Sequence, residues 1–109
     1  MNGLHPKKKI FLLYYSMAVK WTLQTLIAAH SHCQKNKVEI LQSTLCGCIQ
    51  CLAQFEPGEI FDWSDDQETA MCPLCDGSNS VIGNASHYPV ENVEFLQMMK
   101  DKWFDQQYQ

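Results

Sequence analysis

Two stretches of the chain place apolar residues three and four positions apart, which is the spacing of one face of an α-helix. The first stretch covers residues 17–30. We therefore expect a helix over 17–30 that buries a single apolar face. The positions on this face are Val19, Leu23, Leu26, Ile27 and His30.

The second stretch begins at about Glu91 and predicts a C-terminal helix that packs on one face of a small sheet formed by the rest of the domain. Its apolar positions are Val93, Leu96, Met99 and Trp103, with Phe95, Met98 and Phe104 beside them. Core packing is the expected role of Trp103 and Phe104, although such an aromatic pair could also anchor a partner.

Shorter elements are predicted between these helices. Asn36 followed three residues later by Glu39 is typical of a capping box, so a short helix should begin there and end near Ser43. Pro57 and Gly58 indicate a turn between two short segments. Residues 80–83 are expected to form a strand.

Four of the six cysteines form two C-x2-C pairs, Cys48 with Cys51 and Cys72 with Cys75. The spacing C-x2-C-x20-C-x2-C is typical of a site in which four thiolates bind one zinc ion. Two intervening residues allow a tight turn, here called a knuckle, to direct both sulfurs at the same ion. The sequence thus predicts one structural Zn²⁺ held by these four cysteines.

Other uses of the cysteines stay open. A C-x2-C pair can be a dithiol redox site, but that chemistry belongs to a βαβ setting, whereas these pairs flank an acidic segment. Disulfides would require secretion. Cys33 and Cys46 are left over. Cys46 could replace a ligand, or either could be a buried apolar residue.

Taken together, these elements predict an α+β fold. We expect a small zinc-ribbon-like β module with N-terminal helices and a C-terminal covering helix. Residues 17–109 should form a single domain, and residues 1–16, which are basic and then apolar, an N-terminal extension.

The N-terminal extension also has features of a secretory signal. Lys7, Lys8 and Lys9 precede the apolar run 10–15, and the small residues Ser16 and Ala18 follow it. The run is short and contains two tyrosines, so we expect a retained extension, with secretion through a signal-like segment 1–18 as the alternative. No run approaches the ~18 apolar residues of a membrane span.

The charge balance bears on the partners. Eight lysines, no arginine and twelve acidic residues give a formal net charge of −4. Nucleic-acid-binding surfaces need an excess of lysine and arginine, so this balance disfavours them. Six of the acidic residues lie in 56–68, where they predict a solvated surface or, alternatively, a second cation site made of carboxylates.

Several motifs occur together between about His30 and Phe104. They are His30-Ser, Ser43-x-x-Cys-Gly-Cys-x-x-Cys, Phe55-x-Pro-x-Glu-Ile-x-x-Trp, Thr69-Ala-x-Cys-Pro-x-Cys, Ser80-Val-Ile-Gly and Phe95-Leu-x-x-Met-x-x-x-Trp-Phe. In this combination the chain resembles a family of small bacterial cytoplasmic proteins with a paired C-x2-C zinc-ribbon-like core. The resemblance implies zinc and a cytoplasmic location rather than an activity. The family usually has glycine directly after the second pair and aspartate before the Ser-Val dipeptide, where this chain has Asp76 and Asn79.

Three functions are compatible with these features. The leading hypothesis is a zinc-stabilised module that binds another protein without catalysis, because four thiolates leave the metal no open coordination position. The alternative is a metal- or histidine-assisted hydrolase of a nucleotide or phosphoester, with His30, His32 and His87 as candidate catalytic residues. A nucleic-acid-binding zinc ribbon is the third hypothesis, and the charge balance disfavours it.

Overall fold

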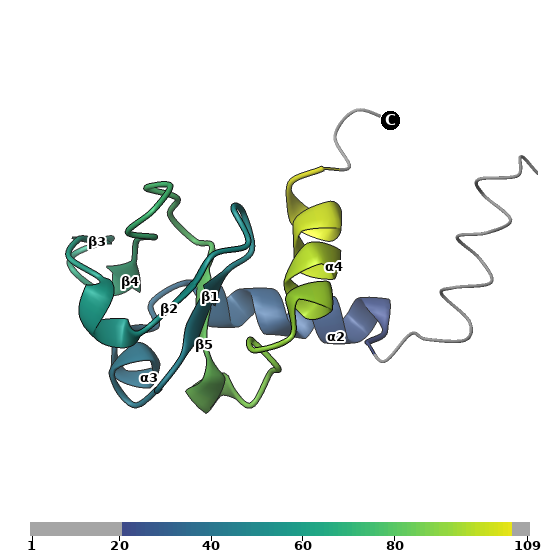
Figure 1. The fold of residues 1–109 in the computed structure, drawn as a ribbon, viewed down its shortest axis with the longest axis horizontal. Coiled ribbons are helices and arrows are strands. Elements are labelled where there is room, and N and C mark those ends of the chain that lie inside the picture. Colours follow the sequence, from purple (N-terminus) through teal and green to yellow (C-terminus); the bar gives the residue numbers. More distant parts are fainter. Residues whose placement is uncertain (1–20, 106–109) are drawn as a thin grey trace, which may run out of the picture.

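Short antiparallel strands and three α-helices make up the described part of the chain, residues 21–105, in the computed structural model (Figure 1). The predicted α+β fold is confirmed. The expected N-terminal extension and the signal-like segment lie outside the described residues. In chain order the elements are α2 (Leu23–His30), η1 (Ser31–Cys33), α3 (Lys37–Leu41), β1 (Cys46–Cys48), β2 (Gln54–Phe55), η2 (Pro57–Glu59), β3 (Trp63–Ser64), β4 (Thr69–Ala70), β5 (Val81–Gly83), η3 (Asn84–Ser86) and α4 (Val93–Trp103), where η marks a 3-10 helix.

The strands form two small antiparallel sheets. In the three-stranded sheet β1 lies between β2 and β5, and Cys46 is paired with both Phe55 and Gly83. The second sheet is the β3–β4 hairpin, in which Trp63 is opposite Ala70. Since β1 has neighbours on both sides, the end of this strand is held firmly where the first knuckle begins.

The two faces of the three-stranded sheet carry different apolar clusters. Successive strand residues point to opposite faces, so Val81 and Ile82 of β5 belong to different clusters. The helical cluster, on the α2 and α4 side, is made of Leu26, Ala29, Cys33, Ile49, Ile82, Val90, Phe95, Leu96 and Met99. The ribbon cluster is made of Ile40, Cys46, Cys48, Phe55, Ile60, Ala70, Cys72 and Val81.

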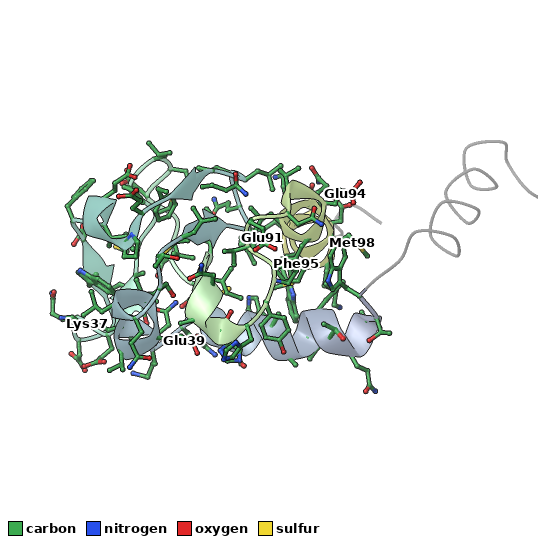
Figure 2. All side chains as sticks on the ribbon, turned by 60° about the horizontal axis from the view of Figure 1, so that its bottom comes forward. Lys37, Glu39, Glu91, Glu94, Phe95 and Met98 are labelled. Atoms are coloured by element: carbon green, nitrogen blue, oxygen red, sulfur yellow. The ribbon has the colours of Figure 1, made fainter. Side chains whose placement is uncertain are left out.

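Helix α4 has the position that the sequence predicts and packs across α2 (Figure 2). It begins after Asn92, whose side chain accepts a hydrogen bond from the amide of Glu94. Its Leu96 is buried directly over Gly47 of β1, where a Cβ atom would lie 2.9 Å from the Leu96 methyl carbons. Val93 is 52% exposed, so the prediction that it is buried was wrong. The buried face of α4 begins with Phe95 and Leu96.

Helix α2 is shorter than predicted. The hydroxyl of Thr22 accepts a hydrogen bond from the amide of Thr25 at 3.1 Å, and this N-cap starts the helix at Leu23. The prediction was therefore wrong at 21–22, while 17–20 lie outside the described residues. Leu26 is buried as expected, but Leu23 and Ile27 are 53% and 48% exposed. The predicted buried face was therefore wrong at these two positions.

Helix α3 begins after Asn36, as predicted, but the predicted capping box does not form. The Asn36 carboxamide makes no cap hydrogen bond. Glu39 instead pairs with His32. A capping box occurs at η2, where Glu59 accepts from the amide of Glu56. No helix within residues 21–105 is long and apolar enough to cross a membrane.

Candidate metal centre

The first knuckle follows directly from the end of β1. The amide of Cys48 donates to the carbonyl of Ala53 at 2.9 Å, and the amide of Leu52 donates back to the carbonyl of Cys48 at 2.8 Å. Within this turn the amides of Gln50 and Cys51 lie 3.3 and 3.5 Å from Cys48 Sγ and donate to it. The backbone thereby fixes the first sulfur of the pair.

The second knuckle repeats this pattern with the same residue spacing. The amide of Cys72 donates to Gly77 and the amide of Asp76 donates to Cys72, both at 2.9 Å. The amide of Leu74 donates to Cys72 Sγ at 3.4 Å. The chain therefore builds the same turn twice, and in both turns the first cysteine receives N–H hydrogen bonds.

Each knuckle also has a left-handed residue immediately after its second cysteine. These residues are Leu52, with φ of 70°, and Asp76, with φ of 63°. Left-handed backbone favours glycine, and aspartate tolerates it better than most residues.

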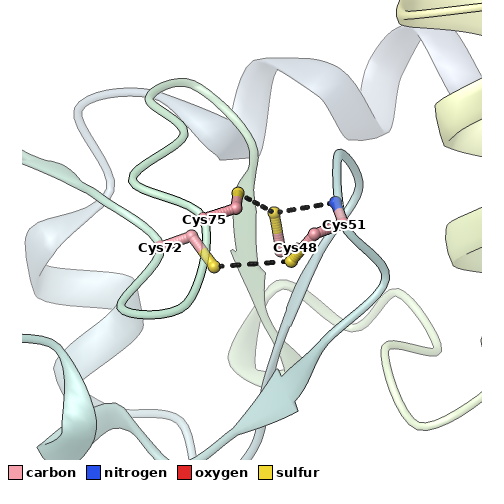
Figure 3. A group of neighbouring side chains, drawn as sticks. All are labelled: Cys48, Cys51, Cys72 and Cys75. Atoms are coloured by element: carbon pink, nitrogen blue, oxygen red, sulfur yellow. Dashed lines mark hydrogen bonds between the residues drawn. The ribbon is translucent and has the colours of Figure 1, made fainter.

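The four knuckle sulfurs converge on one point (Figure 3). All lie within 4.8 Å of one another, with Cys48 3.8 Å from Cys75 and Cys51 3.7 Å from Cys72. Four sulfurs that coordinate one ion tetrahedrally at about 2.3 Å lie about 3.8 Å from one another, whereas the two sulfurs of a disulfide lie about 2.0 Å apart. The spacing therefore fits four thiolates around one metal ion.

Hydrogen bonding and burial set the charge of these thiols. Burial opposes ionisation of Cys48, but its hydrogen bond with the Ser80 hydroxyl, at 3.3 Å, and the hydrogen bonds that two amides donate to it outweigh burial and lower the pKa of Cys48. Burial raises the pKa of Cys72 to about 11 and also raises the pKa of Cys75. Metal binding must therefore displace protons from the cluster, so its affinity should rise with pH.

Cys46 and Cys33 lie outside this group. Cys46 is fully buried in the ribbon cluster, two residues before Cys48 on β1, and burial raises its pKa to about 12. Cys33 is fully buried in the helical cluster. Cys46, which could have replaced a ligand, is not among the four cysteines placed closely enough to hold an ion. Both residues behave as small apolar side chains.

The structure does not gather the three candidate histidines into one site. His30 stacks on Trp103, with ring centroids 4.0 Å apart. His32 Nδ1 lies 2.8 Å from a carboxylate oxygen of Glu39. His87 is exposed just after η3. The three histidines therefore have three different surroundings: an indole ring, a carboxylate and solvent.

The acidic segment 56–68 forms no second metal site. A search of the described residues for cysteine, histidine and carboxylate side chains placed closely enough to hold an ion finds the four knuckle cysteines and no group in this segment. Asp65 instead pairs with Lys35 at 2.9 Å, and the other acidic residues of the segment are exposed. The solvated-surface interpretation holds for this segment.

Two residues that support the site were missed by sequence analysis. Ser80 hydrogen-bonds Cys48 from the segment before β5, and Gln50 places its side chain against Gly77 of the opposite knuckle. A serine three residues beyond a glycine carries no recognisable signal, because its role depends on the pairing of β1 with β5.

Comparisons with protein-family models, curated proteins and solved structures found no match.

Proposed function

We propose that this chain is a zinc-stabilised module that binds another protein and performs no catalysis at its metal centre. The observation that carries the proposal is the convergence of four cysteine sulfurs at tetrahedral spacing. All-sulfur tetrahedral sites suit zinc or iron, and four protein ligands are typical of structural zinc. When bound, the ion would link the two knuckles.

The chain's own residues account for a structural role. Cys48 and Cys72 are buried members of the ribbon cluster, so the ligands are continuous with packed side chains. The sulfur of Cys48 accepts hydrogen bonds from the knuckle amides and is hydrogen-bonded to the Ser80 hydroxyl. With four sulfurs already supplied, a bound ion has no free position for substrate. Free thiolates also persist best in a reducing compartment, which supports a cytoplasmic location.

Exposed apolar side chains near the knuckles support protein binding. Leu74, at the tip of the second knuckle, is 66% exposed, and Phe61, just before β3, is 73% exposed. A large exposed apolar side chain is a candidate anchor for a protein partner. The acidic residues around Phe61 oppose binding to nucleic acid, whose phosphates are also negative. A protein partner is therefore the favoured one.

Metal analysis of the purified chain tests the metal centre. We expect one zinc per chain, and no visible absorption of the kind that iron bound by thiolates would give. A Cys72→Ser variant should lose the ion, whereas the matched Cys46→Ser variant should retain it. A wild-type chain without stoichiometric metal would contradict the proposal.

A binding assay with the zinc-loaded chain tests the second half of the proposal. Partners captured by the wild type should be lost with Phe61→Ser or Leu74→Ser, because these substitutions remove exposed apolar contacts without touching a ligand. Val38→Ser is the control, since Val38 is as exposed but lies on α3. Capture that is equal for all variants, or no partner at several salt concentrations, would count against protein binding through these residues.

The hydrolase alternative retains one favourable observation. A carboxylate bonded to a histidine nitrogen, as Glu39 is to His32 Nδ1 at 2.8 Å, is the arrangement that orients an imidazole as a general base. Any phosphoesterase activity of the pure chain should therefore disappear in His32→Ala and survive in His87→Ala. Activity that survives in His32→Ala would remove this alternative.

A further inference from the structure

We propose that the four knuckle cysteines are also an oxidation site, at which hydrogen peroxide or another hydroperoxide converts the thiolates into two disulfides that join the knuckles, beginning with Cys51 and Cys72. This inference rests on the metal centre of the proposed function. It concerns what the same sulfurs do when an oxidant reaches them.

Exposure of the cysteines selects the point of attack. All six cysteines lie in the described part of the chain, and Cys51 is the exposed one, followed by Cys75, which is partly buried. The remaining ligands are buried, and Cys33 and Cys46 are inaccessible in the two apolar clusters. A peroxide therefore meets Cys51 first, and the two cysteines outside the cluster provide an internal control.

The sulfur contacts select the disulfide pairing. Cys51 Sγ lies 3.7 Å from Cys72 Sγ, and Cys48 Sγ lies 3.8 Å from Cys75 Sγ, so each contact joins one knuckle to the other. Backbone hydrogen bonds hold each knuckle together internally. A small approach of two rigid turns would therefore shorten both contacts at once, and about 1.7 Å suffices to reach the length of a disulfide bond.

The chemistry balances with one peroxide for each disulfide. The Cys51 thiolate attacks a peroxide oxygen, the O–O bond breaks, and after uptake of one proton the products are a sulfenic acid and water. The Cys72 thiolate then attacks the sulfenic sulfur, the S–O bond breaks, and a second proton leaves with the oxygen as water. Two thiolates are oxidised by two electrons, and hydrogen peroxide is reduced to two waters, or an organic hydroperoxide to one alcohol and one water. Cys48 and Cys75 consume a second peroxide in the same way.

Loss of two thiolates leaves a zinc ion with too few ligands to remain bound. The new disulfides would take over its role as the link between the β1–β2 turn and the second knuckle. Oxidation thus replaces the zinc–sulfur bonds between the knuckles with disulfide bonds. A thiol reductant together with added zinc should reduce the disulfides and restore the zinc site.

The test uses the full chain, first shown by metal analysis to carry one zinc. Hydrogen peroxide is added, zinc release is followed with a chromogenic chelator, and remaining thiols are alkylated before disulfide mapping by mass spectrometry. We expect release of the zinc, peptides that join Cys51 to Cys72 and Cys48 to Cys75, and alkylated Cys33 and Cys46. Dithiothreitol with added zinc should restore the starting state.

Two variants sharpen the test. The double variant Cys33→Ala, Cys46→Ala should release zinc at the wild-type rate. Cys51→His keeps a zinc ligand but removes the exposed sulfur, and should slow release roughly tenfold or more, because the thiolate is the nucleophile. If Cys51→His no longer binds zinc, disulfide mapping of the wild type still decides the question.

Several results would overturn the inference. They are a zinc-loaded chain that keeps its ion under peroxide, disulfides formed within a knuckle, sulfinic acids in place of disulfides, or earlier loss of the Cys33 and Cys46 thiols. A chain that carries no zinc before peroxide is added would instead contradict the metal centre itself, so the two failures are distinguishable.

Discussion

Gly77 lies where the two knuckles meet, and the space beside its α-carbon is already occupied. A Cβ atom there would collide with the Gln50 side-chain oxygen and lie 2.8 Å from Ser80 Oγ and 3.2 Å from Cys75 Sγ. We expect Gly77→Ala to displace groups that surround two ligands and to weaken metal binding by about 1–3 kcal/mol, the usual cost of overpacking. Competition with a chelator of known zinc affinity measures this change.

Gly58→Ala is the matched control for that substitution, since nothing lies within 4 Å of a Cβ at Gly58. Its zinc affinity should equal that of the wild type. The double variant Gln50→Ala, Gly77→Ala should recover part of the loss, because it removes the closest obstructing atom. Equal affinities for Gly77→Ala and Gly58→Ala would show that the knuckle contact is not tight.

His30 gives a pH dependence whose sign follows from its environment. Its ring stacks on Trp103, and Lys102 Nζ lies 4.9 Å from the centre of the same indole ring. Burial lowers the pKa of His30 below its ordinary value of 6.5. As the pH falls, the unfolded chain binds the proton first, so this contribution to the free energy of unfolding is complete above about pH 6.5 and declines below it.

Urea denaturation at pH 7.5 and 6.0 measures this dependence, with tryptophan fluorescence as the probe. The wild type should lose more stability over this interval than His30→Phe, which keeps the stacked ring but cannot be protonated. Comparison of the two chains cancels the protonation of the cysteine ligands, which is common to both. An identical pH dependence in both chains would contradict the assignment to His30.

At the scale of elements, spacing predicted which segments are helical but not where their ends or buried faces lie. Thr22 caps α2 with its hydroxyl, so Trp21 and Thr22, which were predicted to be helical, precede the helix. Asn36 and Glu39 have the sequence of a capping box, yet both side chains have partners elsewhere in the fold. Local sequence describes competition within the first turn of a helix, whereas Asn36 is bonded to Val81, far along the chain, and Glu39 to His32 in η1.

Asn36 shows what such a distant partner contributes. Its Nδ2 donates to the carbonyls of His32 and Val81, and its Oδ1 accepts from the amide of Ala70 at 3.1 Å. This one buried side chain therefore links η1, β4 and β5. We expect Asn36→Ala to destabilise the chain by about 2–4 kcal/mol, since buried backbone groups lose their partners.

Chemical denaturation of the zinc-loaded protein measures this loss. Asn92→Ala is the matched control, because Asn92 caps α4 with a single hydrogen bond to the amide of Glu94, and its removal should cost only about 1 kcal/mol. If Asn36→Ala were no more destabilising than Asn92→Ala, the three hydrogen bonds of Asn36 would have little net value in the folded state.

At the scale of the whole molecule, the ligand set could be predicted from the sequence while its surroundings could not. The C-x2-C spacing identifies Cys48, Cys51, Cys72 and Cys75 because the knuckle is a local structure. Cys46 shares a strand and a face with Cys48, and only the pairing of β1 with Phe55 and Gly83 shows that it is enclosed in the ribbon cluster. Contacts of this kind depend on tertiary structure.

The separation of the two clusters predicts how the molecule responds to metal removal. The ribbon cluster contains two ligands, Cys48 and Cys72, whereas the helical cluster contains none of the four. Since the binding energy of a structural metal site is largely folding energy, chelation should open the ribbon first. Apart from the metal site, residues 63–78 are held by the short β3–β4 pairing, by Asn36, by the amides of Lys35 and Lys37 and by the Lys35–Asp65 ion pair.

Hydrogen exchange followed by mass spectrometry measures this response. After chelation, peptides covering 48–51 and 63–78 should lose protection, while peptides from α4, which is buried against α2 and Gly47, should retain part of theirs. Addition of excess zinc should restore the protection that these peptides had before chelation. Uniform loss of protection along the chain would mean that both faces of the sheet fold as one unit, and unchanged exchange would mean that the metal contributes nothing to stability.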